Sequence, residues 1–428
     1  MASGSDPLWP FARRVFCPAP EPDPRNAPYV GALRPFLAHR SATRPPRHAA
    51  VLAPTFPAKG LRGSLPAAAS TTVVNYDMLQ TDQLLAPHTT IQLGGPARHF
   101  AACRTLEEVR YALRWATAQK LPVQVLGGGS NVLFDDEGFA GLVLKVELFG
   151  LRFAEQEGAV LVAAAAGQSW DGLVAECVRR GLTGIECLAG IPGLVGATPI
   201  QNVGAYGQEV KDTIAAVHGL DRGTLEPVVW TNAQCGFAYR QSRFKGVDKD
   251  RYLITEVCYR LEPEGVPKIR YPELRRHLGE GAELGQGQAA LAAVREAVLQ
   301  LRRGKSMVYN PQDPDARSVG SFFLNPLLGE GELVAFRDRL GGLQPPLFPA
   351  PEGTKVPAAW LVEQSGFPKG FRRGGAGISG KHTLALVNCG GTTRQLLELA
   401  EEIRAGVRAR FGITLELEPV VVPWFPTS

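Results

Sequence analysis

The sequence predicts a fold of mixed α-helices and β-strands, and three observations support this prediction. From residue 82 onward, short apolar runs typical of β-strands alternate with longer segments in which apolar residues recur every three or four positions. Glycine-rich stretches stand between several of these segments, as in loops. The chain has 428 residues, of which 45% are hydrophobic, so it can form two or three domains with full-sized cores.

The expected elements follow in order along the chain. Thr105-Leu-Glu-Glu108 is a capping box that begins a helix, and Val109, Ala112, Leu113 and Ala116 mark its apolar face. Strands are predicted at residues 121–126, 132–134, 142–146, 160–165, 252–261 and 412–419, and further helices at 169–180, 288–303 and 393–410.

Residues 1–72 differ from the rest of the chain. They hold 13 of the 34 prolines and many arginines, with few acidic residues and no sustained periodicity, so we expect disorder. An arginine-rich, acid-poor leader resembles an organellar transit peptide. The interpretation we favour is a non-functional extension, with the folded protein beginning near Val73 to Met78.

Composition and charge narrow the range of functions. The net charge is +5 and no run of lysine or arginine is longer than two residues, which argues against a nucleic-acid partner and favours a basic groove for an anionic small molecule. Seven scattered cysteines without a CxxC motif predict a reducing, cytoplasmic compartment, with no disulfide framework and no metal site. No apolar run reaches the roughly 18 residues of a membrane span, so no membrane partner is expected.

Two glycine-rich segments are candidate cofactor loops. Gly127-Gly-Gly-Ser-Asn131 directly follows a predicted strand, and its backbone amides can wrap a diphosphate. It lacks the Gly-Lys-Ser/Thr of a Walker loop, and the strand that follows excludes a dinucleotide GxGxxG motif. A plain glycine turn explains this motif alone equally well.

The second segment, residues 190–207, contains five glycines, two alanines and two prolines in 18 residues, so it cannot be a regular element. Such a segment lets a flat ring lie against the backbone, as a flavin requires, and Gln201 and Asn202 could contact the ring edge. The alternative is a structural loop.

The run Ser318-Val-Gly-Ser-Phe-Phe-Leu-Asn-Pro326 places a hydroxyl, Ser321, between a glycine and two aromatic rings. This order suits a proton donor beside an apolar pocket, in which the rings exclude water and Asn325 orients a polar group. The alternative is a tight turn in which Ser321 caps a helix.

Two further segments carry candidate charged groups. In residues 237–245, Arg240 beside Tyr239 could bind a carboxylate or enolate oxygen in a forked arrangement, whereas a solvated strand with alternating cations would explain Arg243 and Lys245. In residues 412–419, Glu416 and Glu418 share one face of the predicted strand. That face is either exposed or lines a pocket in which a carboxyl takes part in proton chemistry.

These motifs, in this order, resemble those of UDP-N-acetylenolpyruvoylglucosamine reductase, a flavoenzyme family of peptidoglycan precursor synthesis. The resemblance runs from about Thr81 to Val422 and also includes residues 88–97 and 358–364. Each motif alone is moderate evidence, but the ordered set is highly specific.

The resemblance implies a role for each matching residue. The catalytic arginine, the proton-donating serine and the catalytic glutamate fall on Arg240, Ser321 and Glu418, rather than on Glu416. The substrate contacts fall on Tyr239, Tyr271, Lys305, Asn325 and Gln364. The cofactor contacts fall on Gly127, Gly128, Gly129, Ser130, Asn131, Gly190, Pro192, Gly193, Gly196, Ala197, Gln201, Asn202, Gly204, Ala205, Tyr206 and Gly207.

Two residues depart from the family pattern. His88 stands where many members have asparagine, which puts one polar contact near the cofactor in doubt. Leu324 stands where many members have lysine, beside the serine motif, and should not abolish the chemistry.

The fold that the resemblance implies is α+β, with a two-part FAD-binding fold of the vanillyl-alcohol-oxidase (PCMH) type and a C-terminal α+β domain. Residues 73–140 would form the first FAD-binding subdomain and residues 141–306 the second, completed by a strand within 413–428. Residues 307–412 would form the substrate-binding domain.

The implied enzyme is a monomeric FAD-containing oxidoreductase. NADPH would reduce non-covalently bound FAD, and UDP-N-acetylglucosamine enolpyruvate would then be reduced to UDP-N-acetylmuramate. One alternative is a flavin oxidase with a covalently attached flavin, but the 127–131 loop offers no histidine or cysteine for attachment. Another is a flavin- or nucleotide-binding protein without catalysis, which would have no reason to hold Ser321, Arg240 and Glu418 together.

Overall fold

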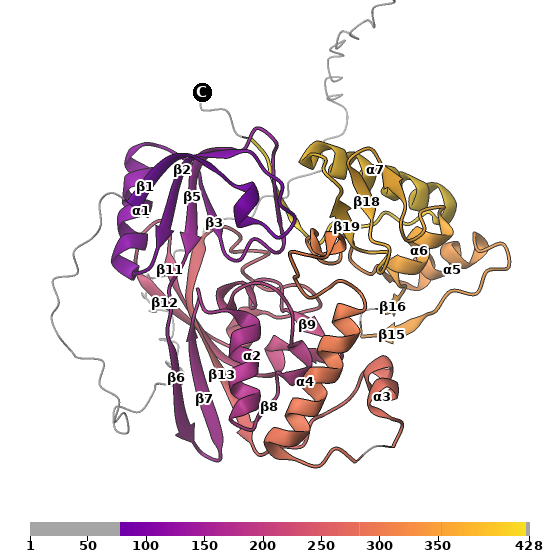
Figure 1. Ribbon diagram of the computed structural model, residues 1–428, viewed down its shortest axis with the longest axis horizontal. Helices are drawn as coiled ribbons and strands as arrows, with labels where there is room; N and C mark the ends of the chain where they lie inside the picture. Colours follow the sequence, from indigo (N-terminus) through magenta and orange to yellow (C-terminus); the bar gives the residue numbers. More distant parts are fainter. Residues whose placement is uncertain (1–77, 282, 352, 425–428) are drawn as a thin grey trace, which may run out of the picture. The chain divides into compact units, whose positions relative to one another are not determined.

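The computed structural model describes residues 78–281, 283–351 and 353–424 (Figure 1). Residues 1–72, for which the sequence predicts disorder, lie outside the described residues. The folded part was expected to begin between Val73 and Met78, and of this range only Met78 is described. Within the described ranges, no helix is long and apolar enough to cross a membrane.

The N-terminal elements form a four-stranded sheet with one helix. The strand order is β1 (Leu79–Leu84), β2 (Pro96–Cys103), β5 (Phe139–Val146) and β3 (Val123–Leu126), in which β2, β5 and β3 are parallel and β1 is antiparallel to β2. Helix α1 (Leu106–Ala118) begins at the predicted capping box, where the Glu108 backbone N–H donates to the Thr105 hydroxyl at 3.1 Å. The buried face of α1 is the predicted one, and it packs against residues of the sheet.

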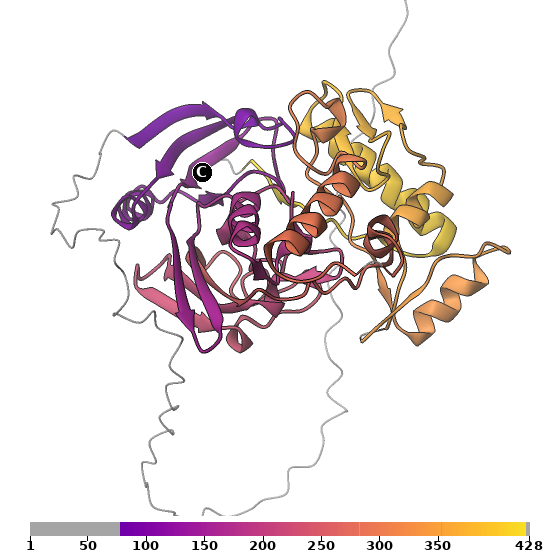
Figure 2. The same ribbon diagram turned by 60° about the horizontal axis from the view of Figure 1, so that its bottom comes forward.

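A larger antiparallel sheet follows in the chain. Its order is β12 (Pro227–Thr231), β11 (Ile214–Asp221), β13 (Tyr252–Pro263), β7 (Ala159–Ala165) and β6 (Leu151–Gln156), and β8 (Leu182–Thr183) also pairs with β13. Helices α2 (Trp170–Arg179) and α4 (Gly287–Arg303) lie side by side along this sheet (Figures 1 and 2). Successive side chains of a strand point to opposite faces of a sheet. On the face toward these two helices, side chains such as Val162 of β7, Val217 of β11 and Val257 of β13 share one core with them.

The C-terminal elements combine helices with two small sheets. The helices are α5 (Glu330–Asp338), α6 (Ala358–Gln364) and α7 (Thr393–Phe411). The sheets are β14 (Leu327–Leu328), β16 (Gly353–Lys355) and β15 (Phe348–Ala350), and β17 (Arg372–Arg373), β18 (Ala376–Ile378) and β19 (Leu386–Asn388). Apolar residues from these elements form a separate core, which includes Phe322 and Phe323.

The connecting segments contain several short elements. They are α3 (Pro272–Leu278), the paired strands β9 (Gly204–Ala205) and β10 (Gln208–Glu209), and the 3₁₀ turns Ala86–His88, Glu186–Leu188, Val195–Ala197, Val210–Asp212, Ala233–Cys235 and Pro314–Ala316. The predicted glycine-rich segment 190–207 is therefore built from turns and a two-residue strand pair, as its composition requires.

The closing segment corrects two expectations. Residues 412–419, predicted as a strand, form one isolated bridge, between Leu417 and Phe323, and the strand β20 (Val420–Val422) begins after them. β20 pairs in parallel with β4 (Val132–Phe134), which belongs to the range expected for the first FAD-binding subdomain and not the second. Burial explains this path, because Leu415 packs in the C-terminal core whereas Val422 packs with the N-terminal sheet. The domain boundaries themselves stay predictions.

Candidate active site

A cavity of about 1260 Å³ is lined by residues from the N-terminal, central and C-terminal elements. A single small-molecule site usually occupies roughly 300–1,000 Å³, so this cavity has room for a cofactor and a substrate together. Its lining includes residues within the segments 124–132, 191–212, 239–245, 270–276, 302–307 and 319–325, together with Lys355, His382 and Glu418.

The two glycine-rich loops meet in this cavity. A Cβ atom at Gly128 would lie 2.8 Å from the Cα of Gly193, so the loops approach backbone to backbone. The Ser130 hydroxyl fastens them by donating to the Pro192 carbonyl at 3.1 Å. The junction therefore presents mainly backbone, beside the side chain of Leu194, and such a backbone cradle suits a flat ring or a diphosphate.

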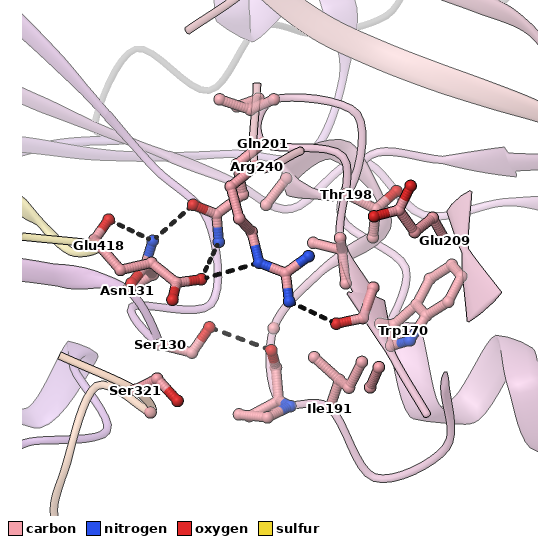
Figure 3. Close-up of a pocket in the computed structure, with 18 of the residues that line it drawn as sticks. Ser130, Asn131, Trp170, Ile191, Thr198, Gln201, Glu209, Arg240, Ser321 and Glu418 are labelled. Carbon is pink, nitrogen blue, oxygen red and sulfur yellow. Dashed lines mark hydrogen bonds and ion pairs between the residues drawn. The ribbon is translucent and has the colours of Figure 1, made fainter. Parts of the chain in front are cut away.

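A hydrogen-bond network ties both loops to the C-terminal segment (Figure 3). The Asn131 side-chain amide donates to Gln201 Oε1 at 3.3 Å and to the Glu418 carbonyl at 3.4 Å. The Gln201 amide in turn donates to Glu418 Oε1 at 3.4 Å. Two residues predicted to contact the cofactor thus also position the predicted catalytic glutamate.

Arg240 lies in a two-residue turn and not in a solvated strand, the interpretation that the sequence left open. Ala238 and Gln241 exchange backbone hydrogen bonds of 3.1 and 3.2 Å across this turn. The φ angle of Arg240 is +54°, in the left-handed region that non-glycine residues rarely occupy. Its guanidinium lies in the cavity, donates to the Gly204 carbonyl at 2.6 Å and pairs with Glu418 Oε1 at 3.3 Å.

Ser321 lines the same cavity from the C-terminal elements. The neighbouring Phe322 holds it in place, because its backbone N–H donates to the Leu384 carbonyl at 2.8 Å and its carbonyl accepts from the Glu418 N–H at 3.0 Å. The Ser321 hydroxyl has no hydrogen-bond partner among the described residues (Figure 3). It is therefore free to donate to a ligand.

Glu418 is the cavity glutamate, whereas Glu416 is exposed and lies outside the cavity lining. Burial raises the pKa of the Glu418 carboxyl, and the positive charges of Arg240 and Lys245 oppose that rise. The sequence could not separate the two glutamates by alternation alone, because the alternation of burial ends after Glu416, and Leu417 and Glu418 are both half-buried.

Tyr239 and Asn325 also line the cavity. The Asn325 amide nitrogen donates to the Tyr239 hydroxyl at 3.4 Å, and its oxygen accepts from the Ala358 backbone N–H at 2.9 Å. The guanidinium carbon of Arg240 and the ammonium nitrogen of Lys355 each lie 5.5 Å from the centroid of the Tyr239 ring. Two positive charges therefore lie near the Tyr239 ring, where they can attract an anion.

Lys305 and Tyr271 lie at another part of the cavity lining. Lys305 pairs with Glu273 at 2.7 Å, and its ammonium lies 5.8 Å from the centroid of the Tyr206 ring. Tyr206 contacts Tyr271 edge to face, with ring centroids 5.4 Å apart, and the side chain of Tyr271 is exposed. The three predicted contacts in this group are thus brought together.

Three predicted contacts lie outside the cavity lining. Gly190 turns the chain with φ +69°, and its N–H donates to Asp171. Asn202 is fully buried, and its amide donates to Glu209 and to the Ala238 carbonyl while its oxygen accepts from the Lys211 N–H. Gln364 ends α6 with its carbonyl bonded to Arg410. The N–H of Gly190 and the side chain of Asn202 are engaged by local structure, and none of the three residues lines the cavity.

The two departures from the family pattern leave the cavity unchanged. The imidazole of His88 stacks on Phe100 and faces Lys145, and only its backbone carbonyl touches the cofactor loop, against Gly129. Leu324 lies outside the cavity lining. The aromatic rings that precede it are likewise buried in the C-terminal core, so they anchor the Ser321 segment and do not wall off the pocket as expected.

Sequence reasoning missed several cavity residues. Burial and the nearby Lys305 and Lys369 lower the pKa of His382 to about 4. Burial lowers the pKa of Arg302 to about 10, and its Nε has no hydrogen-bond partner within the described residues. No motif marks His382, and Arg302 stands in the last turn of a predicted amphipathic helix, where a cation is ordinary.

A possible metal-ligand grouping lies away from the cavity, although the sequence predicts no metal site. His218, Glu256 and Cys258 bring ligand atoms within 4.8 Å of one another. They lie on β11 and β13 with Glu256 directly opposite His218, and spacing along the sequence cannot show such a cross-strand group. One oxygen of Glu256 is engaged by Arg152 at 2.7 Å.

The glycine cradle and the adjoining arginine, serine and glutamate define the class of protein. Their fit to a flavin agrees with a protein-family model described as an FAD binding domain, which matches residues 97–223. A second family model, described as the UDP-N-acetylenolpyruvoylglucosamine reductase C-terminal domain, matches residues 312–422. The molecule is therefore a flavoprotein oxidoreductase with an α+β fold.

Comparisons that cover about four fifths of the chain give the family. The chain is 49% identical over 348 residues to the UDP-N-acetylenolpyruvoylglucosamine reductase of Thermobifida fusca, which covers 79% of this chain and 96% of that protein. It is 50% identical over 364 residues to the protein of that name from Streptomyces avermitilis, which covers 82% and 97%. The crystal structure of the Thermus caldophilus UDP-N-acetylenolpyruvylglucosamine reductase matches with a TM-score of 0.55 at 26% identity, over 79% of this chain and 97% of that one. The chain belongs to the UDP-N-acetylenolpyruvoylglucosamine reductase family.

Proposed function

We propose that this protein reduces UDP-N-acetylglucosamine enolpyruvate to UDP-N-acetylmuramate, with NADPH as electron donor and non-covalently bound FAD as carrier. The observation that supports this most directly is the convergence of Arg240, Ser321 and Glu418 on one cavity beside the glycine cradle. These residues come from a turn, a loop and the C-terminal segment, so no local structural need explains their meeting.

The cavity residues divide into two groups in this proposal. FAD, when bound, supplies a hydride that it receives from NADPH. Its contacts would be Gly127, Gly128, Gly129, Ser130, Asn131, Pro192, Gly193, Gly196, Ala197, Gln201, Gly204, Ala205, Tyr206 and Gly207. The substrate would contact Tyr239, Tyr271, Lys305 and Asn325, and we add Arg302, Lys355 and His382 because they line the same cavity.

The chemistry of the substrate then assigns the roles. Reduction of an enol ether adds a hydride to the terminal carbon, and negative charge develops on the carbon that bears the carboxylate. The Arg240 guanidinium can donate to carboxylate or enolate oxygens, and its ion pair with Glu418 fixes its orientation. The Ser321 hydroxyl, which has no partner among the described residues, would deliver the proton to the carbanionic carbon.

The spectrum of the flavin tests this proposal. The purified protein, kept without oxygen, should lose its yellow absorbance on addition of NADPH. Addition of UDP-N-acetylglucosamine enolpyruvate should restore the absorbance and yield UDP-N-acetylmuramate. Bleaching without restoration would reject the substrate, and flavin that stays with acid-precipitated protein would favour a covalent oxidase.

We also propose a cytoplasmic monomer. The thiol of Cys389 is free and exposed, which suits a reducing compartment. Size-exclusion chromatography with light scattering would give the mass of the particle, and a dimer would contradict the proposal.

A further inference from the structure

The Arg240 turn is closed by the backbone hydrogen bonds between Ala238 and Gln241 and is held at Ala238 by the Asn202 amide, but none of these contacts binds the carbonyl of Arg240 itself. The left-handed backbone of Arg240 is a conformation that glycine usually adopts. The hydrogen bonds of the guanidinium to the Gly204 carbonyl and to Glu418 fix only the end of a long side chain. Strained backbone persists when surrounding groups hold it, and a group that binds the Arg240 carbonyl would do so.

That group is Lys245. Its ammonium donates to the Arg240 carbonyl at 3.2 Å, and the Lys245 side chain is half-buried in the cavity lining. The sequence alone is explained by a Lys245 side chain that extends into solvent, but such a side chain would have no fixed acceptor for its ammonium. The contact restrains the peptide that follows the Arg240 Cα and so the direction in which the guanidinium leaves the turn.

The chain around Lys245 is itself rigidly placed. The buried Ser242 donates to the Ile200 carbonyl at 2.5 Å and accepts from the Phe244 N–H at 3.1 Å. Phe244 is buried and packs edge to face on Trp230, with ring centroids 5.0 Å apart. The segment that leads from the Arg240 turn to Lys245 is thus fixed to the central core, so the Lys245 side chain starts from a fixed position.

The charge of Lys245 also acts on the predicted catalytic glutamate. Glu418 faces Arg240 and Lys245 from the turn and the amide of Gln201 from the second glycine loop, whereas Glu416 on its own segment points outward. Burial alone raises the pKa of Glu418, and the positive charge of Lys245 opposes that rise. Lys245 therefore contributes to keeping the carboxylate paired with Arg240.

We infer that Lys245 is a positioning residue for the reduction step: it fastens the strained Arg240 turn and supplies a second positive charge to Glu418. This inference rests on the proposed function, because the roles of Arg240 and Glu418 do. It predicts that Lys245 matters chiefly when substrate is reduced and much less when NADPH reduces the cofactor.

The test compares Lys245→Met, which keeps length but removes the charge and the donor, with Lys245→Arg, which restores both. Lys268→Met is the matched control, since Lys268 is exposed and outside the cavity. In stopped-flow traces, Lys245→Met should bind FAD and accept electrons from NADPH at a rate within about threefold of the parent. Its reoxidation by UDP-N-acetylglucosamine enolpyruvate should slow by about 10–100-fold, and Lys245→Arg should recover most of that loss.

The pH profile separates a charge effect from mere packing. Loss of a neighbouring cation favours the neutral form of the Glu418 carboxyl and so raises its pKa. The apparent pKa of Glu418 in the pH profile of the reoxidation rate should therefore be higher in Lys245→Met than in the parent, and should return in Lys245→Arg. An unchanged rate and profile in Lys245→Met would overturn the inference. Equal slowing in both variants, with an unmoved profile, would also overturn it, because packing alone would then explain the effect.

A readout without substrate keeps this test apart from that of the proposed function. Crystal structures of Lys245→Met and the parent, both without substrate, should differ at the Arg240 turn, with the Arg240–Glu418 ion pair lost in the variant. An unchanged turn would reject the positioning role. If the parent itself fails to reduce the enolpyruvyl substrate, the proposed function fails, and the structural comparison still decides whether Lys245 holds Arg240.

Discussion

At the scale of single residues, some polar side chains of the cavity bind one another, whereas the hydroxyl of Ser321 is available to a ligand. Arg240, Glu418, Gln201 and Asn131 satisfy one another through hydrogen bonds and one ion pair. The Ser321 hydroxyl has no partner within the described part of the chain. This division is expected when a proton donor must be available to substrate while its neighbours stay fixed.

Replacement of Ser321 by alanine tests its role as proton donor. Reduction of the flavin by NADPH should stay near normal, because no substrate proton takes part in that step. Reoxidation by the enolpyruvyl substrate should slow by roughly 10²–10⁴-fold, the usual contribution of general acid catalysis. Stopped-flow absorbance measures the two steps separately.

Ser321→Cys is the companion variant, since a thiol can also donate a proton, and it should retain part of the activity. If the alanine variant reoxidises as fast as the parent, the proton comes from another group. If both steps fail equally in the alanine variant, Ser321 supports the structure of the site and is not the donor.

His382 gives a prediction about stability and pH. Its pKa in the folded protein is about 4, against 6.5 for the ordinary imidazole, because of burial and the nearby cations Lys305, Lys369 and Arg302. Between these two values the unfolded chain binds a proton that the folded chain does not, so this contribution to stability is present above pH 6.5 and is lost as pH falls toward 4. The loss should be on the order of 2–3 kcal/mol.

His382→Gln removes this titration, so the free energy of unfolding should fall less between pH 6.5 and 4 than it does in the parent. Urea unfolding at a series of pH values measures the difference. His277→Gln, which changes an exposed histidine of α3, is the matched control. Parallel curves for the parent and His382→Gln would contradict the prediction.

At the scale of elements, the glycine loops work because they touch each other through backbone. A methyl group at Gly128 would meet the Gly193 Cα at 2.8 Å, and a backbone atom cannot turn aside as a flexible side chain can. Gly128→Ala should therefore separate the loops, lower FAD affinity at least tenfold and cost about 1–3 kcal/mol of stability from overpacking.

Gly331→Ala is the control for that variant. Gly331 lies in α5, and a Cβ atom there would have no neighbour within 4 Å. It should leave FAD binding unchanged and stabilise the helix by up to about 1 kcal/mol. Isothermal titration with FAD and thermal melting check both variants, and equal FAD affinity in Gly128→Ala and the parent would disprove the steric argument.

Elements with a strong local signal could be predicted from the sequence. The capping box at Thr105 and the apolar face of α1 are as expected, and strand β4 has the predicted bounds. The 412–419 segment misled the prediction, because alternation indicates an extended chain but not whether a partner strand runs beside it. Pairing of β20 with β4 joins residues almost 290 positions apart, and no local pattern carries such information.

In the candidate site too, residues with a local sequence signal could be predicted, and residues whose place depends on distant packing could not. Residues inside motifs, such as Arg240, Ser321 and Glu418, could be found because chemistry restricts the residue types around them. His382 and Arg302 could not, because their place in the cavity depends on how distant elements pack. Asn202 stands inside a motif, yet its amide binds the Ala238 carbonyl of the Arg240 turn and does not line the cavity. The sequence cannot show which side of a loop faces the ligand.

At the scale of the whole molecule, the leader offers a simple test. Its composition predicts disorder, and residues 1–72 lie outside the described part of the structure. Deletion of residues 1–72 should leave the melting temperature and turnover intact, because a segment without a core contributes little to stability. A melting temperature lowered by several degrees in a thermal scan of the truncated protein would show that the leader packs on the folded part.

The path of the closing segment also has a consequence for synthesis. A chain leaves the ribosome N-terminus first, so β4 emerges long before its parallel partner β20 exists. Glu418 lies two residues before the start of β20, so it emerges at the same stage as that strand. The glycine loops can therefore be made and folded while the site still lacks its carboxylate. A chain cut short by a stop codon before Glu418 would lack the Arg240–Glu418 pair, and on the proposed roles it should not reduce substrate.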